Sequence, residues 1–108
     1  NERTAQVARR IASGTRWRTR ICFATACGPT VAEALSGLRA EGAERFVVAP
    51  WFLAPGLLTD RVAAAAEATA LATVLAQTIG AHPRLVDVVL DRYDSALRDA
   101  ERPVVLSA

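Results

Sequence analysis

The sequence lacks the features that mark several large classes of protein. It has only two cysteines, too few for a disulfide framework, so we expect a reducing, cytoplasmic setting. It has no apolar run near the ~20 residues that a membrane helix needs and it opens on no signal peptide, so we expect no membrane partner. Lysine is absent, and acidic residues are interspersed with the arginines along the chain without any polybasic block, which argues against a nucleic-acid partner.

What is present indicates one folded domain. The chain has 108 residues, of which 52% are hydrophobic, and a net charge of only +2, values outside the range of disordered segments. We expect residues 1–108 to form a single half domain, with 103–108 as a tail. The first residue is Asn1 rather than Met, so we expect the chain to be part of a longer product.

The hydrophobic pattern alternates between helices and strands. In chain order we predict helix 3–13, strand 18–26, a helix opened by Gly28-Pro29 and stopped by Gly42, strand 46–53, a helix with Thr59 as its N-cap, strand 73–77 and a helix that begins at His82-Pro83. This order predicts an α/β fold with a parallel sheet, helices on both faces and a site beyond the carboxyl ends of the strands.

Folds of this kind normally start on a strand, whereas this chain starts on a helix. The apolar, β-branched segment 103–107 is typical of the strand that is lacking. Either this tail fills a position in the sheet or the first strand lies upstream of Asn1, and we favour the upstream strand.

Three stretches at predicted strand-to-helix turns, residues 23–30, 48–60 and 79–83, resemble the sirohydrochlorin chelatases of the CbiX/SirB type. The middle stretch carries the strongest likeness: Pro-aromatic-Phe-Leu at 50–53, then Gly56 and the acid Asp60. The resemblance implies a flavodoxin-like, three-layer α/β sandwich, two halves of which are fused or paired as a homodimer. It also implies insertion of Co²⁺ or Fe²⁺, as the substrate metal, into sirohydrochlorin, with no tightly bound cofactor.

The sequence departs from the family where the chemistry is expected. The family's His after the Gly falls on Leu58, and its acid in the first turn falls on Thr25. We therefore assign no catalytic residue and no metal ligand. We expect the chain to be the supporting, C-terminal half of a chelatase, with a second half or a homodimer mate as partner.

Four residues are candidates for binding the tetrapyrrole. Gly56 would let the loop approach the ligand, Trp51 and Leu58 would form an apolar wall, and Thr25 would donate a hydrogen bond in place of the acid. The alternative is a tetrapyrrole-binding or dimerisation module without turnover. A nucleotide-binding domain is disfavoured because the sequence has no Gly-rich fingerprint.

Other conspicuous residues have simpler interpretations. We expect His82 to cap a helix rather than bind metal, because a lone imidazole is a poor metal site. Cys22 fits a core position, whereas Cys27 lies at the end of a predicted strand, just before a helix. Of Trp51 and Phe52, alternation points one to each side, so at least one belongs to the core.

Two basic or polar segments remain. The turn 28–30 exposes backbone N–H groups at a helix start, a weak signal for binding of an anion. The run 16–20 alternates arginines with Trp17 and Thr19, and we interpret it as a solvated lead-in to a strand rather than a nucleic-acid strip.

Overall fold

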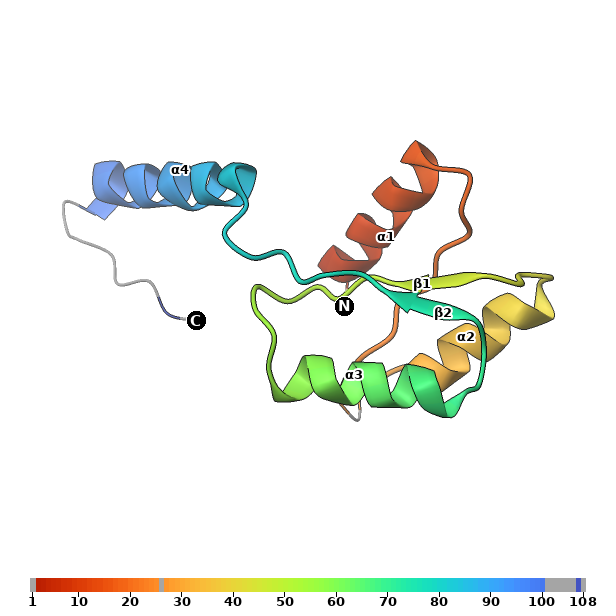
Figure 1. The fold of residues 1–108 in the computed structure, drawn as a ribbon. Coiled ribbons are helices and arrows are strands. Elements are labelled where there is room, and N and C mark those ends of the chain that lie inside the picture. Colours follow the sequence, from red (N-terminus) through yellow and green to blue (C-terminus); the bar gives the residue numbers. More distant parts are fainter. Residues whose placement is uncertain (1, 26, 101–106, 108) are drawn as a thin grey trace. The chain divides into compact units, whose positions relative to one another are not determined.

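A computed structural model describes residues 2–25, 27–100 and 107 of the chain (Figure 1). Its elements are α1 (Glu2–Gly14), α2 (Val31–Ala40), β1 (Phe46–Val48), α3 (Leu57–Ala68), β2 (Thr73–Leu75) and α4 (Pro83–Ala100). They fall into two compact units, residues 1–78 and 79–108. The expectation of one domain over residues 1–108 therefore stays a prediction.

The first unit contains the parallel strand pair. β1 and β2 pair in register from Phe46 with Thr73 to Val48 with Leu75, and α3 connects them. This arrangement confirms a β-α-β unit with parallel strands. Both strands are shorter than predicted, because the ladder ends soon after Val48, whose carbonyl accepts from the Ala76 N–H at 2.9 Å. Pro50, which has no N–H to donate, follows directly.

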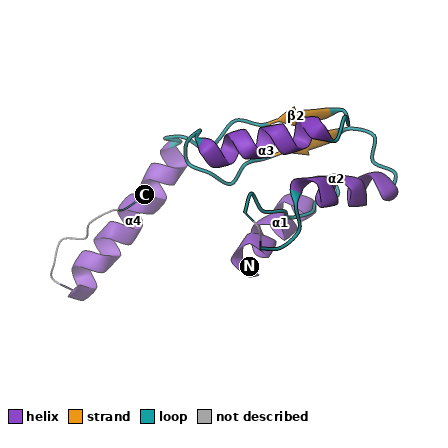
Figure 2. Ribbon diagram, turned by 90° about the horizontal axis from the view of Figure 1, so that it is seen from below, coloured by secondary structure: helices purple, strands orange, loops and turns teal. Residues whose placement is uncertain are grey.

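The core of this unit lies between the sheet and two helices. Its buried apolar residues are Val31, Ala34 and Leu35 of α2, Phe46 of β1, and Val62 and Ala66 of α3. Figure 2 shows α3 running along the two strands, and α2 contacts α3. The helices α2 and α3 thus pack on one face of a small parallel sheet, as an α/β fold requires, while the three-layer sandwich remains a prediction.

The strand predicted over 18–26 is wrong for the residues that the structure describes. Residues 18–25 form no strand, and the one backbone hydrogen bond recorded for them outside regular structure runs from the Phe23 N–H to the Pro29 carbonyl. Cys22 and Ala24 nevertheless pack against the core. The apolar pattern therefore predicted the burial correctly, but a strand also needs a neighbour to hydrogen-bond, and no strand among the described residues pairs with residues 18–25.

Two helix starts also differ from the predictions. α2 begins at Val31, because Thr30 is its N-cap and forms a reciprocal capping box with Glu33, which leaves Pro29 outside the helix. α3 begins at Leu57 with Gly56 as N-cap, so Thr59 is not the cap but the third residue of the helix, in its first turn.

The predicted helix ends agree with the structure. α1 ends at Gly14, although it has no buried residue. After α2, Gly42 adopts a φ of 100°, the left-handed conformation that favours glycine at the end of a helix.

The second unit consists mainly of α4, which begins at Pro83 as predicted. The extra strand predicted for the tail falls on positions 103–106, which lie outside the described residues. None of the helices in the described part of the chain combines the length and apolarity that crossing a bilayer requires.

Candidate functional site

The loop between β1 and α3 exposes a group of apolar side chains at the carboxyl end of β1. Trp51 is 65% exposed, Leu53 54% and Leu57, in the first turn of α3, 68%. Phe52 is partly buried, but neither Trp51 nor Phe52 packs in the core cluster of the described residues, so the prediction that at least one of them is a core residue is wrong. Large apolar side chains gathered on one exposed loop are typical of a surface that binds an apolar ligand or partner.

The end of this loop is fixed by a buried threonine. The Thr59 hydroxyl accepts a hydrogen bond from the Gly56 N–H and donates one to the Gly56 carbonyl, both at 2.8 Å. Gly56 has extended backbone, and a Cβ there would meet nothing within 4 Å. The backbone does not require glycine at this position, but the open space leaves room for close approach of a ligand. Leu58 is half-buried beside Thr59.

Thr25 lies on a different loop, the one that leads into α2, and it is exposed. Trp51 and Gly56 lie on the loop between β1 and α3, and Leu58 follows in the first turn of α3. No hydrogen bond or ion pair among the described residues links Thr25 to that loop. Whether Thr25 shares a cleft with the other three stays a prediction.

Two hollows lie elsewhere, at the amino ends of the strands. Their volumes are about 340 Å³ and 360 Å³, and the residues common to both are Trp17, Arg45, Phe46 and Val47. None of the four predicted binding residues lines either hollow. Sequence reasoning missed this region, because its residues come from three separate segments and form no motif.

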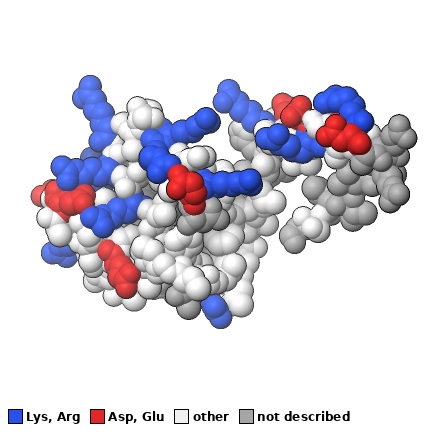
Figure 3. Space-filling view, turned by 180° about the vertical axis from the view of Figure 1, so that it is seen from behind, with Lys and Arg blue, Asp and Glu red and all other residues white. Residues whose placement is uncertain are grey.

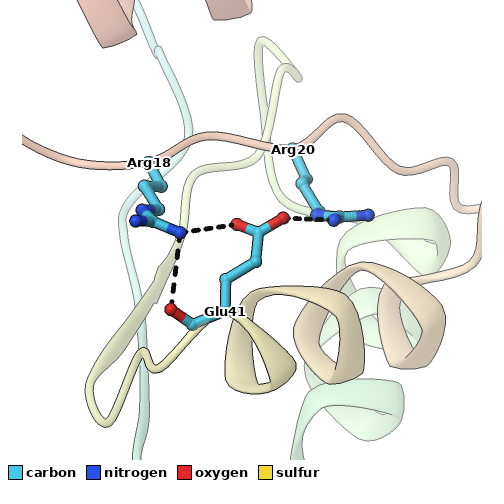
Figure 4. A network of polar contacts seen from close by, with 3 residues as sticks. All are labelled: Arg18, Arg20 and Glu41. Carbon is cyan, nitrogen blue, oxygen red and sulfur yellow. Dashed lines mark hydrogen bonds and ion pairs between the residues drawn. The ribbon is translucent and has the colours of Figure 1, made fainter.

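A charged cluster borders the same region. The Glu41 carboxylate, just after α2, accepts hydrogen bonds from Arg20 at 2.5 Å and from Arg18 at 3.4 Å (Figure 4). The Arg20 hydrogen bond is the main cause that holds the pKa of Glu41 below its usual value. The Arg20 guanidinium also lies so close to Gly37 that a Cβ there would come within 2.7 Å of it. The cluster thus fastens residues 18–20 to the end of α2.

The remaining arginines are interspersed with acids. Figure 3 shows arginine side chains projecting from one face, with Asp and Glu side chains among them. The run 16–20 does not lead into a strand, and two of its arginines are held by Glu41.

The lone histidine caps a helix, as expected. The Nδ1 atom of His82 accepts a hydrogen bond from the Arg84 N–H at 3.2 Å, and its carbonyl accepts from Leu85 and Val86 in the first turn of α4. In the described part of the chain, no group of three or more His, Cys, Asp or Glu side chains is arranged to hold a metal ion.

The two cysteines differ as their positions suggest. Cys22 is partly buried against the core, and burial raises the pKa of its thiol. Cys27 is exposed.

The start of α2 is a poorer anion site than its sequence suggests. The Glu33 carboxylate accepts from the Thr30 N–H at 3.2 Å, and the Thr30 hydroxyl accepts from the Glu33 N–H at 3.1 Å. Two of the N–H groups at this helix end are therefore already bonded within the protein. Gly28, with a φ of 102°, packs against the Phe23 ring.

The parallel strand pair, its connecting helix and the exposed loop define an α/β protein of the kind that places ligands beyond the carboxyl ends of its strands. The CbiX family model matches residues 1–96. The chain therefore belongs to the CbiX family of sirohydrochlorin chelatases, whose general activity is insertion of a metal ion into a tetrapyrrole. No curated protein matches the sequence.

Proposed function

We propose that this chain forms one wall of a tetrapyrrole cleft and supports, rather than performs, the insertion of Co²⁺ or Fe²⁺ into sirohydrochlorin. The observation that carries the proposal is the exposed apolar loop at the carboxyl end of β1, in a member of the CbiX family. The macrocycle is flat and apolar at its faces, and an indole that is 65% exposed at Trp51 is suited to stack on it.

The supporting role of this chain follows from the lack of side chains suited to removing protons and delivering the metal. Removing the pyrrole protons needs a base, and delivering the metal needs a ligand; imidazole suits both tasks. Leu58 stands where the family has a histidine, and Thr25 where it has an acid. The one imidazole of the chain, His82, uses its Nδ1 to cap α4. We therefore assign proton removal and metal delivery to a second half or a second chain.

Binding can be tested by titrating sirohydrochlorin with the chain and following the absorbance of the macrocycle. We expect Trp51→Ala to weaken binding about tenfold, which corresponds to ~1.4 kcal/mol, because the stacked indole is lost. The matched control is Trp17→Ala, which removes another exposed indole but at the amino ends of the strands and should leave binding unchanged. Equal effects of the two substitutions, or no binding by the natural chain, would refute the cleft.

Catalysis is tested by adding Co²⁺ to the complex and comparing the insertion rate with a protein-free control. The proposal expects binding with no acceleration by the natural chain, and acceleration by Leu58→His, which restores an imidazole at the family's position. Acceleration by the natural chain would contradict the supporting role. Binding without acceleration by either chain would favour a module that holds the tetrapyrrole without turnover.

A further inference from the structure

In the described part of the chain, the loop between β1 and α3 is hydrogen-bonded only at its two ends (Figure 1). At its start, the Val48 carbonyl accepts a hydrogen bond from the Ala76 N–H at 2.9 Å. At its end, Gly56 is bonded through both its N–H and its carbonyl. Residues 49–55 make no hydrogen bond with any residue that the structure describes. The conformation of the loop therefore depends on how firmly its two ends are held.

One side chain supplies most of the bonds at the second end. The Thr59 hydroxyl accepts from the Gly56 N–H and donates to the Gly56 carbonyl, both at 2.8 Å. The same carbonyl accepts from the Asp60 N–H at 3.0 Å, so every backbone polar group of Gly56 is bonded. A hydroxyl is suited to this task because one oxygen atom both donates and accepts. An apolar side chain of the same shape would form neither bond.

Thr59 is itself held firmly. It is 7% exposed, and among the described residues it is the one polar side chain that is buried. A buried hydroxyl keeps its partners, because leaving them unpaired costs free energy. The helix that carries it packs into the core through Val62 and Ala66. The hydroxyl thus joins the end of the loop to a fixed part of the unit.

The bond to the Gly56 N–H extends beyond the ordinary role of a threonine in a helix. A threonine hydroxyl commonly donates to the carbonyl three or four residues earlier, and that bond alone serves the helix. Gly56 is the N-cap, however, and its N–H lies on the side of the loop rather than of the helix. The second bond therefore acts on the segment that carries Trp51 and Leu53.

We propose, on the basis of the function proposed above, that Thr59 is a positioning residue for tetrapyrrole binding. Its hydroxyl holds Gly56 and thereby keeps the preceding loop, with Trp51, in the conformation that meets the macrocycle. A loop that is ordered before binding loses less conformational freedom when the ligand arrives, so it binds the ligand more tightly. Thr59 acts through Gly56, because its own side chain is buried.

Two substitutions separate the hydroxyl of Thr59 from its packing. Thr59→Val keeps the size and branching of the side chain but removes both hydrogen bonds to Gly56, whereas Thr59→Ser keeps the hydroxyl and removes a buried methyl group. In absorbance titrations of sirohydrochlorin, we expect Thr59→Val to bind about fivefold more weakly, because loop side chains must then be ordered on binding. Thr59→Ser should bind as the natural chain does, although the lost methyl group lowers its stability.

Val62→Ala is the matched control for stability. Val62 lies in the core on the same helix and makes no contact through a hydroxyl, so its truncation should destabilise the unit and leave sirohydrochlorin binding unchanged. All four chains are compared at a temperature where circular dichroism shows each of them folded.

A second measurement needs no tetrapyrrole. In a Trp17→Phe background Trp51 is the one remaining tryptophan, so its fluorescence anisotropy follows the mobility of the loop. We expect a lower anisotropy in Thr59→Val than in the background chain or in Thr59→Ser. Hydrogen exchange at the Gly56 amide, followed by NMR, should be faster in Thr59→Val alone.

The outcomes distinguish a failure of this proposal from a failure of the proposed function. Absence of sirohydrochlorin binding by the natural chain would overturn both roles in tetrapyrrole binding, even if the anisotropy shows that Thr59 orders the loop. Unchanged binding or unchanged anisotropy in Thr59→Val would overturn the positioning role alone. Binding that follows stability in all three variants would also overturn it, because Thr59 would then serve only the fold.

Discussion

Val62→Ala should destabilise the first unit because Val62 lies in the centre of α3 and is only 6% exposed in the core. The substitution removes two methyl groups from a buried site, which costs about 1.6 kcal/mol at ~0.8 kcal/mol for each. The cavity that remains adds to this loss. Alanine has the higher helix propensity, which offsets this loss of stability by roughly 0.5 kcal/mol. We expect a net loss of about 1–2 kcal/mol in the free energy of unfolding.

The matched control is Val88→Ala in the middle of α4. It removes the same atoms and gains the same helix propensity, but Val88 is 51% exposed. No burial is lost, so the expected change is within about 0.5 kcal/mol and in the stabilising direction.

Urea unfolding followed by two signals separates the units. Both tryptophans, Trp17 and Trp51, belong to the first unit, so their fluorescence follows that unit alone, whereas far-ultraviolet circular dichroism follows all helices. Val62→Ala should lower the midpoint of the fluorescence transition with an unchanged slope, and Val88→Ala should leave that midpoint where it is. If the two substitutions shift it equally, the core does not lie between α3 and the sheet.

Three further predictions follow from the polar contacts. Because the Arg20 hydrogen bond lowers the pKa of Glu41, this carboxylate contributes stability above its unfolded pKa and loses it as the pH falls through the lowered value. The midpoint temperature of thermal unfolding should accordingly fall less between neutral and acid pH for Glu41→Gln than for the natural chain. At neutral pH, iodoacetamide should label Cys27 well before Cys22, because burial raises the pKa of the Cys22 thiol. Equal labelling rates of the two cysteines, measured by mass spectrometry, would contradict the burial of Cys22. Thr30→Ala removes the cap of α2 and should cost about 1 kcal/mol in urea unfolding, while Thr30→Ser should cost much less.

Helix boundaries were the most predictable part of the fold where a single residue type determines them. Gly42 ends α2 because only glycine readily adopts its φ of 100°. The sequence pattern predicts too early a start for the same helix because Pro29 is suited to a first turn, whereas Thr30 and Glu33 together satisfy two backbone donors. The two capping hydrogen bonds set the start of the helix, because together they outweigh the preference of one proline for the first turn.

The segment 18–25 shows why a strand is harder to predict than its burial. The continuous apolar run at its centre correctly indicates contact with the core, which Cys22 and Ala24 make. Strand formation depends on a hydrogen-bonding neighbour from another part of the chain, and a local pattern carries no information about that neighbour. The ion pairs of Arg18 and Arg20 with Glu41 also join residues that are far apart in sequence, so no local sequence pattern predicts them.

The loop after β1 was predictable because its residues are contiguous, whereas the hollow at the amino ends was not. Trp17, Arg45 and Val74 meet there from three segments that share no motif. Leu58 shows a different limit, because comparison with a family motif does not reveal whether a residue is buried. The family resemblance predicts a histidine at position 58, but the structure places Leu58 half-buried in the first turn of α3, beside the buried Thr59. A leucine there contributes apolar burial that an imidazole would partly give up. The Leu58→His variant should therefore gain a metal ligand while losing some stability, so its insertion rate must be measured where circular dichroism shows it folded.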